Sequence, residues 1–399
     1  MLSALFFIGS LIGALLTSNG LRRRSLWLPA MITNELPLHH IVWQAVVVGL
    51  FAWGGVLDHI LGRIALAITL ASWAGLLVMA VWSVRARPTM AAALAPMGLK
   101  PGSGSPPTLS DIVRVRGKLP RGVEAIRGIA YGPEPAQLLD IHRPGGDQSG
   151  LPVLLQIHGG GWMRGHRERE SRPLIHRMAA AGWVCASMDY RLSPAATFPD
   201  HLIDVKLAIS WLRANEAEHG GDSSFVALSG GSAGAHLAGL AALTPDDLAY
   251  QPGFASADTS VQACVTFYGI HDLLDRNRIR YPWPFVESRV MKVSPDADPE
   301  AWNRASPLTQ VGPHAPPFLV MHGSHDSLVP PDESRQFVAA LRAVSQSPVL
   351  YAEIPGGTHG FDFFHSLRSR HVVRGVESFL NASLADHKAR NSHTRSTEK

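Results

Sequence analysis

A serine flanked by small residues stands where a strand is expected to meet a helix. Residues 230–234 read Gly-Gly-Ser-Ala-Gly, after the apolar run 225–228 and before the small-residue run 235–240. A Gly-x-Ser-x-Gly sequence in that context is typical of a sharp turn that lifts the serine hydroxyl clear of the backbone. We therefore predict that Ser232 is a nucleophile that attacks a carbonyl carbon. The alternative is a glycine-rich turn with a structural role.

Three consecutive glycines begin at Gly159, directly after the apolar run 153–157. Glycine loses more conformational entropy on folding than other residues, so such a run indicates that the backbone itself is used. The oxygen of a carbonyl becomes negative when a hydroxyl attacks it, and N–H groups stabilise that charge. We predict that the amides of Gly159, Gly160 and Ala233 form an oxyanion hole. A flexible loop is the alternative.

A serine hydroxyl needs a general base, and the base needs a group that orients it. Asp326 follows a predicted strand at residues 318–321, and His359 follows another at 350–354. Loops just past strand ends are where open sheets place their ligands. We predict that His359 takes the proton of Ser232 and that Asp326 holds the imidazole.

Other side chains could fill the same roles. Asp272 follows a strand and Asp362 follows His359, so either could be the acid. The other nearby histidines are less suitable as the base, because His322 and His325 belong to the acid loop and His236 is expected to pack within the nucleophile helix.

Five motifs together resemble a known family. They are His-Gly-Gly-Gly-Trp at 158–162, Asp-Tyr-Arg-Leu-Ser-Pro at 189–194, the serine motif, His-Gly-Ser-His-Asp at 322–326 and Gly-Thr-His-Gly-Phe at 357–361. This set is similar to the esterase/lipase family related to hormone-sensitive lipase, especially the bacterial carboxylesterases of the α/β-hydrolase superfamily. The resemblance covers residues 122–384. It implies the triad and oxyanion hole given above, and hydrolysis of short- to medium-chain esters without a metal or organic cofactor.

One position departs from that family. Many members have an aspartate just before the nucleophile, whereas this chain has Gly231. With the sequence at 139–144, this form also resembles feruloyl-esterase-like, kynurenine-formamidase-like and isoprenylcysteine-methylesterase-like relatives. An amidase or formamidase and an acyltransferase that use the same triad therefore stay open, and a non-catalytic membrane scaffold is a remote alternative.

The first hundred residues have a different composition. The runs 1–21, 36–57 and 64–84 lack Asp, Glu, Lys and Arg, and each is about long enough to cross a ~30 Å hydrocarbon core. We predict three transmembrane helices. Buried soluble helices are the alternative, and a signal peptide is a further alternative for the first run.

Basic residues set the expected orientation. Arg22, Arg23 and Arg24 end the first run, and Arg85 and Arg87 end the third. Two spans separate the clusters, so both lie on one side of the membrane, which the positive-inside rule makes cytoplasmic. We expect a multi-pass membrane protein with its catalytic domain on the cytoplasmic face.

The expected organisation has four parts. Residues 1–87 span the membrane, 88–121 form a linker or docking arm, 122–384 form the catalytic domain, and 385–399 form a polar, disordered tail. Within the arm, 101–107 are expected to be mobile and 111–119 to cover the active site. From residue 125 strands alternate with helices, which predicts the α/β class with a mostly parallel sheet flanked by helices. The resemblance implies that this is an α/β-hydrolase fold.

The remaining expectations concern ligands. Residues 269–306 interrupt the strand–helix rhythm, and we expect Trp283 and Phe285 there, with Trp162, to line the substrate pocket; a packed surface excursion is the alternative. The net charge of +4 comes with no nucleic-acid recognition motif. The expected partners are a lipophilic ester substrate and membrane lipids. Oligomeric state is not predicted.

Overall fold

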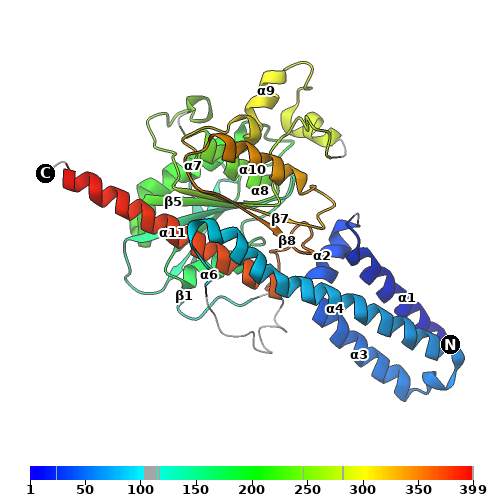
Figure 1. Ribbon diagram of the computed structural model, residues 1–399. Helices are drawn as coiled ribbons and strands as arrows, with labels where there is room; N and C mark the ends of the chain where they lie inside the picture. The colour runs from blue at the N-terminus through cyan, green and yellow to red at the C-terminus, as the bar shows by residue number, and fades with distance from the viewer. Residues whose placement is uncertain (24, 103–114, 116, 246, 281–282, 398–399) are drawn as a thin grey trace.

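The computed structural model describes residues 1–23, 25–102, 115, 117–245, 247–280 and 283–397. Its centre is an eight-stranded sheet in the order β1-β2-β4-β3-β5-β6-β7-β8 (Figure 1). Strands β1 and β2 pair antiparallel, β2 runs antiparallel to β4, and all later pairs are parallel. The strands are β1 Val123–Ala130, β2 Leu138–Pro144, β3 Leu151–Ile157, β4 Val184–Met188, β5 Gly221–Gly231, β6 Ala263–Phe267, β7 Phe318–Gly323 and β8 Val349–Ile354.

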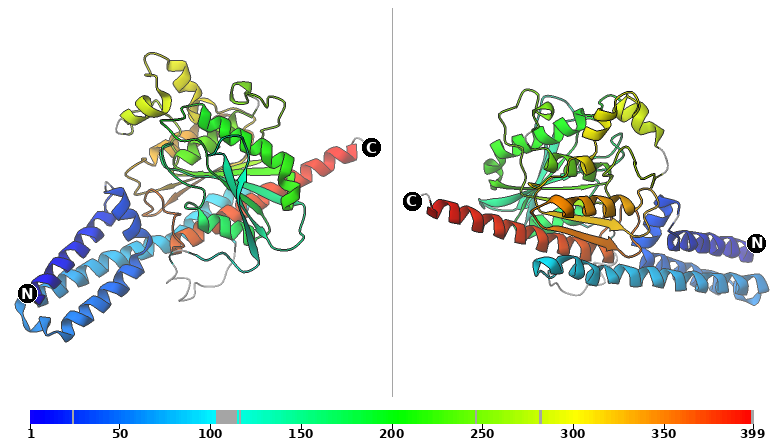
Figure 2. Two further views of the ribbon diagram at one scale, coloured as in Figure 1. Left: turned by 180° about the vertical axis from the view of Figure 1, so that it is seen from behind. Right: turned by 45° about the horizontal axis from the view of Figure 1, so that its top comes forward.

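Helices cover both faces of this sheet (Figure 2). One core packs α7 (Asp200–Asn215), α8 (Ala233–Leu243) and α10 (Asp332–Val344) on the sheet. The other packs α6 (Arg172–Ala180) and α11 (Leu367–Thr397) on the opposite face. The short α9, Pro299–Arg304, lies in the segment after β6. The prediction of a mostly parallel, helix-flanked sheet is confirmed.

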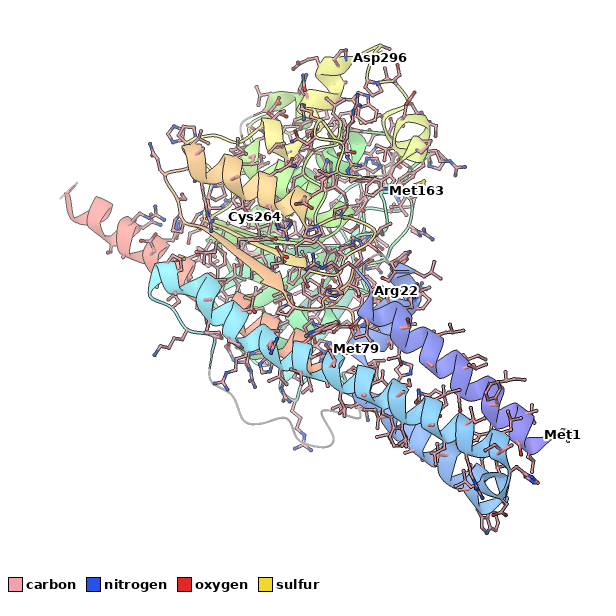
Figure 3. All side chains as sticks on the ribbon, turned by 45° about the vertical axis from the view of Figure 1, so that its right-hand side comes forward. Met1, Arg22, Met79, Met163, Cys264 and Asp296 are labelled. Carbon is pink, nitrogen blue, oxygen red and sulfur yellow. The ribbon has the colours of Figure 1, made fainter. Side chains whose placement is uncertain are left out.

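Four helices precede the sheet and form an arm that projects from it (Figure 1). They are α1 Leu2–Leu21, α2 Trp27–Glu35, α3 Pro37–Trp53 and α4 Ile60–Leu94. By length and composition α1 and α4 could each cross a membrane, and α2 with α3 form a third candidate that bends by 83°. Figure 3 places Met1 at the far end of the arm, and Arg22 and Met79 near the sheet domain.

The helix that begins in the predicted membrane region continues beyond residue 88. Helix α4 continues through Pro88 to Leu94, and Met90 and Leu94 are fully buried beside α6 and α11. Their spacing of four residues puts both side chains on one helical face, which explains the packing. The second half of α4 is therefore part of the hydrolase-domain core.

Two further expectations meet different outcomes. The tail expected to be disordered after residue 384 continues α11 as far as Thr397, because no helix breaker follows the packed part of that helix. The mobile segment at 101–107 and the cover at 111–119 lie largely outside the described residues, as does Arg24.

Candidate active site

The nucleophile candidate occupies the turn between β5 and α8. Ser232 has a φ of 56°, in the left-handed region that non-glycine residues seldom adopt. The turn also brings backbones into close contact. A Cβ on Gly230 would lie 2.3 Å from the carbonyl oxygen of Gly234, and a Cβ on Gly234 would lie 2.2 Å from that of Ile157. Glycine is thus required on both sides of the serine motif, as the sequence predicts.

The structure brings the three predicted catalytic side chains into one hydrogen-bonded relay. His359 Nε2 lies 2.9 Å from Ser232 Oγ, and His359 Nδ1 lies 2.7 Å from Asp326 Oδ2. The loops after β7 and β8 position Asp326 and His359, and neighbouring parallel strands bring these loops together. This is the geometry that a serine nucleophile, a general base and an orienting carboxylate require.

The environment of Asp326 keeps it ionised. Its Oδ1 accepts the backbone N–H groups of Leu328 and Val329, each at 2.9 Å. Burial by itself would raise the pKa of Asp326, but the nearby imidazoles of His359 and His322 outweigh it and hold that pKa well below its ordinary value. A carboxylate is therefore available to orient His359 across the working pH range.

The alternative acids and bases have other partners. Asp272 pairs with Arg276, and Asp362 accepts hydrogen bonds from Ser171 and Tyr268. His236 is buried and contacts the carbonyl oxygen of Ala305 at 2.7 Å. Burial lowers the pKa of His236 to about 4, which suits the expected packing role.

The predicted oxyanion hole needs a correction. The Gly159 N–H donates to Glu170 Oε2 at 2.6 Å, so this amide is directed at a carboxylate and is not free for a substrate oxygen. Within the described part of the chain, the N–H groups of Gly160 and Ala233 have no acceptor. Ala233 is also the first residue of α8, where the helix dipole favours negative charge. Gly160 and Ala233 stay candidates for the oxyanion hole. A Cβ on Gly159 would lie 3.2 Å from the Cβ of Ser232, so Gly159 leaves room beside the nucleophile.

Sequence reasoning missed two polar residues beneath the nucleophile. Burial raises the pKa of Glu170 to about 7 despite its hydrogen bond from Gly159. Tyr268 donates to Asp362, and its ring lies 4.6 Å from the His359 ring. A Cβ at Gly231 would lie 2.8 Å from the Tyr268 hydroxyl oxygen, so the departure at Gly231 makes room for this tyrosine. No motif in a single sequence marks these contacts.

The three residues predicted to line the substrate pocket lie in different surroundings. Trp162 is 1% exposed and its indole N–H donates to His236, so its expected place in the pocket wall is wrong: it packs in the core. Trp283 and Phe285 are half-buried and stacked, and the Phe285 ring would lie 3.7 Å from a Cβ on Gly161. These two aromatics therefore stand next to the glycine loop.

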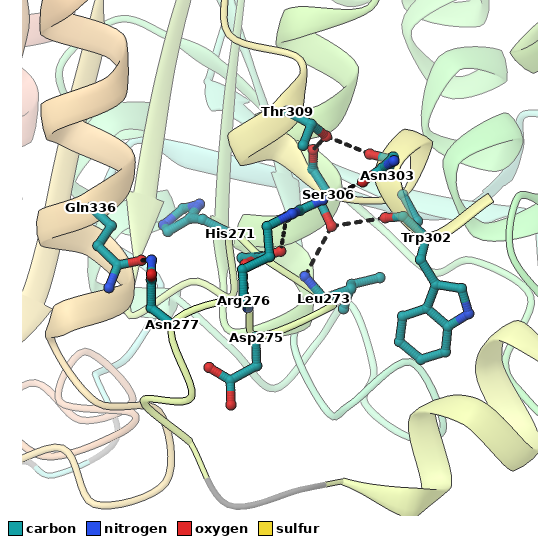
Figure 4. Close-up of polar contacts among 12 residues, drawn as sticks. His271, Leu273, Asp275, Arg276, Asn277, Trp302, Asn303, Ser306, Thr309 and Gln336 are labelled. Atoms are coloured by element: carbon teal, nitrogen blue, oxygen red, sulfur yellow. Dashed lines mark hydrogen bonds and ion pairs between the residues drawn. The ribbon is translucent and has the colours of Figure 1, made fainter. Parts of the chain in front are cut away.

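Hydrogen bonds fix the segment that carries these aromatics to the rest of the domain. Figure 4 shows Ser306 Oγ between Trp302 and Leu273; it donates to the Trp302 carbonyl oxygen at 2.8 Å and accepts from the Leu273 N–H at 3.0 Å. Asn277 donates to Gln336 on α10 at 2.7 Å. Tyr281 and Pro282 lie outside the described residues.

The N-terminal arm contacts the catalytic loops directly. The Trp27 ring on α2 meets the His359 ring edge-on, with centroids 6.3 Å apart. Ser327, next to the catalytic acid, donates to the carbonyl oxygen of Ser25 at 2.8 Å. The α4 residue Trp82 lies 4.7 Å from the His325 ring. The arm thus forms part of the surroundings of the relay, which the sequence did not predict.

The geometry can be compared with known proteins. The BD-FAE family model matches residues 139–341. The probable carboxylic ester hydrolase LipM of Mycobacterium tuberculosis is 47% identical over 249 residues, a match that covers 61% of this chain and 58% of LipM. The isoprenylcysteine alpha-carbonyl methylesterase ICME of Arabidopsis thaliana is 32% identical, over 58% of this chain and 56% of that protein. The chain thus spans less than two thirds of the length of these curated relatives.

A solved structure has the same fold. The butyrate-bound thermophilic esterase Est2 of the Planctomycetes species Thermogutta terrifontis superposes with a TM-score of 0.52 at 25% identity. The match covers 68% of this chain and 94% of the esterase.

Proposed function

The chain belongs to the BD-FAE family of α/β hydrolases, and we propose that it is a membrane-anchored serine hydrolase that cleaves carboxylic esters. One observation carries the proposal: Ser232, His359 and Asp326 form a continuous relay through contacts of 2.9 and 2.7 Å. The ester hydrolase names of relatives such as LipM support the choice of an ester substrate.

The first half of the reaction forms an acyl-enzyme. Ser232 Oγ attacks the ester carbonyl carbon while His359 Nε2 takes the hydroxyl proton. Asp326 keeps the imidazole oriented and stabilises its positive charge. The amides of Gly160 and Ala233 face the developing oxyanion, a contribution of about 3–4 kcal/mol for one such donor. The carbon–oxygen bond to the alcohol then breaks, and His359 gives its proton to the departing alkoxide oxygen.

The second half releases the acid. A water molecule gives a proton to His359 and attacks the acyl carbon, and the Ser232 oxygen leaves and recovers the proton. No step needs a group beyond the relay, the oxyanion donors and water. The half-buried Trp283 and Phe285 would contact the acyl or alcohol part of the substrate.

The N-terminal arm supports a lipophilic substrate. On α2 the side chains of Leu28 and Ile32 are exposed, while Trp27 adjoins His359. A short helix with exposed apolar side chains beside basic residues is suited to the membrane–water interface. We infer that α2 lies at that interface and that an ester dissolved in the bilayer reaches Ser232 beside it.

The same arm supports the proposed location. Arg22 follows the end of α1 and lies near the hydrolase domain (Figure 3), and Arg85 lies in α4 six residues beyond Met79, which is also near that domain. The turn between α3 and α4 lies at the opposite end of the arm (Figure 1). The positive-inside rule then puts the hydrolase domain on the cytoplasmic face of the membrane.

Hydrolysis by the full-length protein tests the proposal. We expect turnover of p-nitrophenyl esters from acetate to decanoate, and a loss of about 10⁵–10⁶-fold in kcat for Ser232→Ala. Ser288→Ala, at an exposed serine, is the matched control. Retention of more than a tenth of the rate by Ser232→Ala would count against the mechanism. Matched amide and N-formyl substrates, and product analysis with added alcohols, separate the amidase, formamidase and acyltransferase alternatives.

A further inference from the structure

A cavity lies at the junction between the arm and the hydrolase domain. Its volume is about 650 Å³, and it is distinct from the relay. The beginnings of α3 and α11 and one face of α6 line it, together with Glu35 of α2, Ser83 of α4 and residues 117–121. The cavity is therefore built from the arm, from residues 117–121 and, for the largest part, from the sheet domain.

The cavity wall is strongly basic. Its cations are Lys118, Arg121, Arg177, Arg370 and Arg374. Among the described lining residues Glu35 is the one carboxylate, and it already forms a buried ion pair with Arg368. Arg177 has its own partner in Glu377. Within the described ranges, Lys118, Arg121 and Arg374 form no ion pair.

The positive charges in the cavity wall lie close enough to lower one another's pKa values. The pKa of the Arg374 guanidinium is lowered by partial burial and then by the charges of Arg370 and Arg177. Burial, Arg172 and Arg370 likewise lower the pKa of His365 in the same wall. The first turns of α3 and α11 add their positive dipole ends. This combination favours a compact anion.

The helix lengths place the cavity at the level of the membrane surface. Helix α1 has 20 residues, which at about 1.5 Å each span the ~30 Å hydrocarbon core. The same length measured from Ile60 along α4 ends at Met79, which lies near the hydrolase domain (Figure 3). Ser83 is one turn further, and Pro37 begins α3 at the same end of the arm. Both cavity residues therefore lie at headgroup level.

We infer that this cavity binds the phosphate headgroup of an anionic phospholipid and so ties the hydrolase domain to the bilayer surface. The site is separate from the catalytic relay, so the inference does not depend on the proposed ester hydrolysis. Basic pockets at the cytoplasmic ends of membrane helices are suited to such headgroups.

The test uses the full-length Ser232→Ala chain in detergent, where no turnover can occur. Dioctanoyl phosphatidylglycerol is titrated by calorimetry, with dioctanoyl phosphatidylcholine and inorganic phosphate as comparison ligands. We expect saturable binding of phosphatidylglycerol and an increase of about 30-fold in its Kd when Arg121→Gln and Arg374→Gln are combined. Arg289→Gln, on an exposed residue outside the cavity, should leave the Kd within about twofold.

A second variant distinguishes weaker lipid binding from loss of folding. Lys118 is exposed, so Lys118→Gln should keep the melting temperature and raise the Kd about fivefold. Equal affinity for phosphatidylcholine and phosphatidylglycerol, or unchanged phosphatidylglycerol binding in the Lys118 variant, would overturn the inference. Inorganic phosphate that binds as tightly as phosphatidylglycerol would overturn the assignment to a lipid.

Discussion

Asp326 decides whether the His359 imidazole presents the correct nitrogen to Ser232. Its contact with His359 Nδ1 keeps the proton on that nitrogen and leaves Nε2 free to accept. Because its carboxylate also accepts two backbone N–H groups, its position is fixed independently of the histidine. An isosteric amide at this position would keep the shape and lose the orienting charge.

We therefore predict that Asp326→Asn lowers kcat by about 10⁴-fold with little change in KM. Steady-state kinetics with p-nitrophenyl butyrate measure both quantities. Asp272→Asn is the matched control, because Asp272 pairs with Arg276 away from the relay, and its kcat should stay within about tenfold of wild type. A larger loss in the Asp272 variant than in the Asp326 variant would reverse the assignment of the acid.

Glu170 makes the stability of the folded protein depend on pH. Burial raises its pKa to about 7 in the folded chain, whereas an unfolded glutamate titrates near about 4.3. Between those values the unfolded chain loses the proton and the folded chain keeps it, so this group makes the protein less stable as pH rises. Above about pH 7 the folded chain also loses this proton, and the stability falls no further because of Glu170.

Glu170→Gln cannot ionise and keeps an acceptor for the Gly159 N–H. We predict that the melting temperature of this variant, relative to wild type, is higher at about pH 8 than at about pH 5. Scanning fluorimetry at both pH values measures the difference. Glu168→Gln removes only the surface partner of Arg127, so its melting temperature relative to wild type should be the same at the two pH values. A pH-independent difference for the Glu170 variant would refute the raised pKa.

The sequence identified some residues of the site and missed the contacts of others. Ser232, Asp326 and His359 were predictable because each stands in a short motif directly after an apolar strand. The direction of the Gly159 amide was not predictable, because it depends on Glu170, which a separate turn places nearby. The ion pairs of Asp189 with Arg167 and of Arg191 with Asp204 were likewise not predictable, because each partner lies in another segment of the chain.

At the scale of elements, α2 links the arm to α11 of the hydrolase domain through a buried ion pair. Glu35 at the end of α2 pairs with Arg368 of α11, and Ser366 donates to the same carboxylate at 2.7 Å. Both charged side chains are buried. Removing one charge leaves the other without compensation, which is more costly than removing both.

We predict that Glu35→Leu and Arg368→Leu each destabilise the protein by about 3–5 kcal/mol and that the double variant regains at least half of the loss. Thermal unfolding of the full-length chain in nanodiscs gives the comparison. Asp332→Asn, in a pair with Arg335 that is largely exposed, should cost less than about 1 kcal/mol. Additive losses in the double variant would mean that the two charges do not interact.

Element boundaries were harder to predict than element types. The apolar runs predicted helices correctly, but nothing in residues 22–36 signalled that α2 would form and turn by 83° into α3. Hydropathy also ended the third run at residue 84, because arginines follow it. Only the tertiary contacts of Met90 and Leu94 make α4 continue into the hydrolase domain.

At the scale of the whole molecule, the arm and the domain share one core. We predict that a chain lacking residues 1–97 has a lower melting temperature than one lacking 1–84, because it also loses Ala86, Met90 and Leu94, which are fully buried. Loss of one such large side chain typically costs about 2–5 kcal/mol. Equal melting temperatures for the two chains would mean that the second half of α4 does not stabilise the hydrolase domain.

The orientation of the molecule can be tested with single cysteines. Native Cys185 and Cys264 are buried and should not react with an impermeant maleimide. We predict that Gln148→Cys, on the hydrolase domain, is labelled in inverted vesicles and protected in intact spheroplasts. His59→Cys, in the turn at the far end of the arm, should show the opposite pattern. The reverse result would place the hydrolase domain outside the cytoplasm.

The most direct test of the relay is covalent labelling of the full-length protein with a fluorophosphonate, followed by peptide mapping. A hydroxyl activated by His359 should carry the adduct, so we expect one modified residue, Ser232, and much slower labelling in His359→Ala. An adduct on another serine, or labelling of Ser232 at an unchanged rate without His359, would contradict the catalytic arrangement described for this protein.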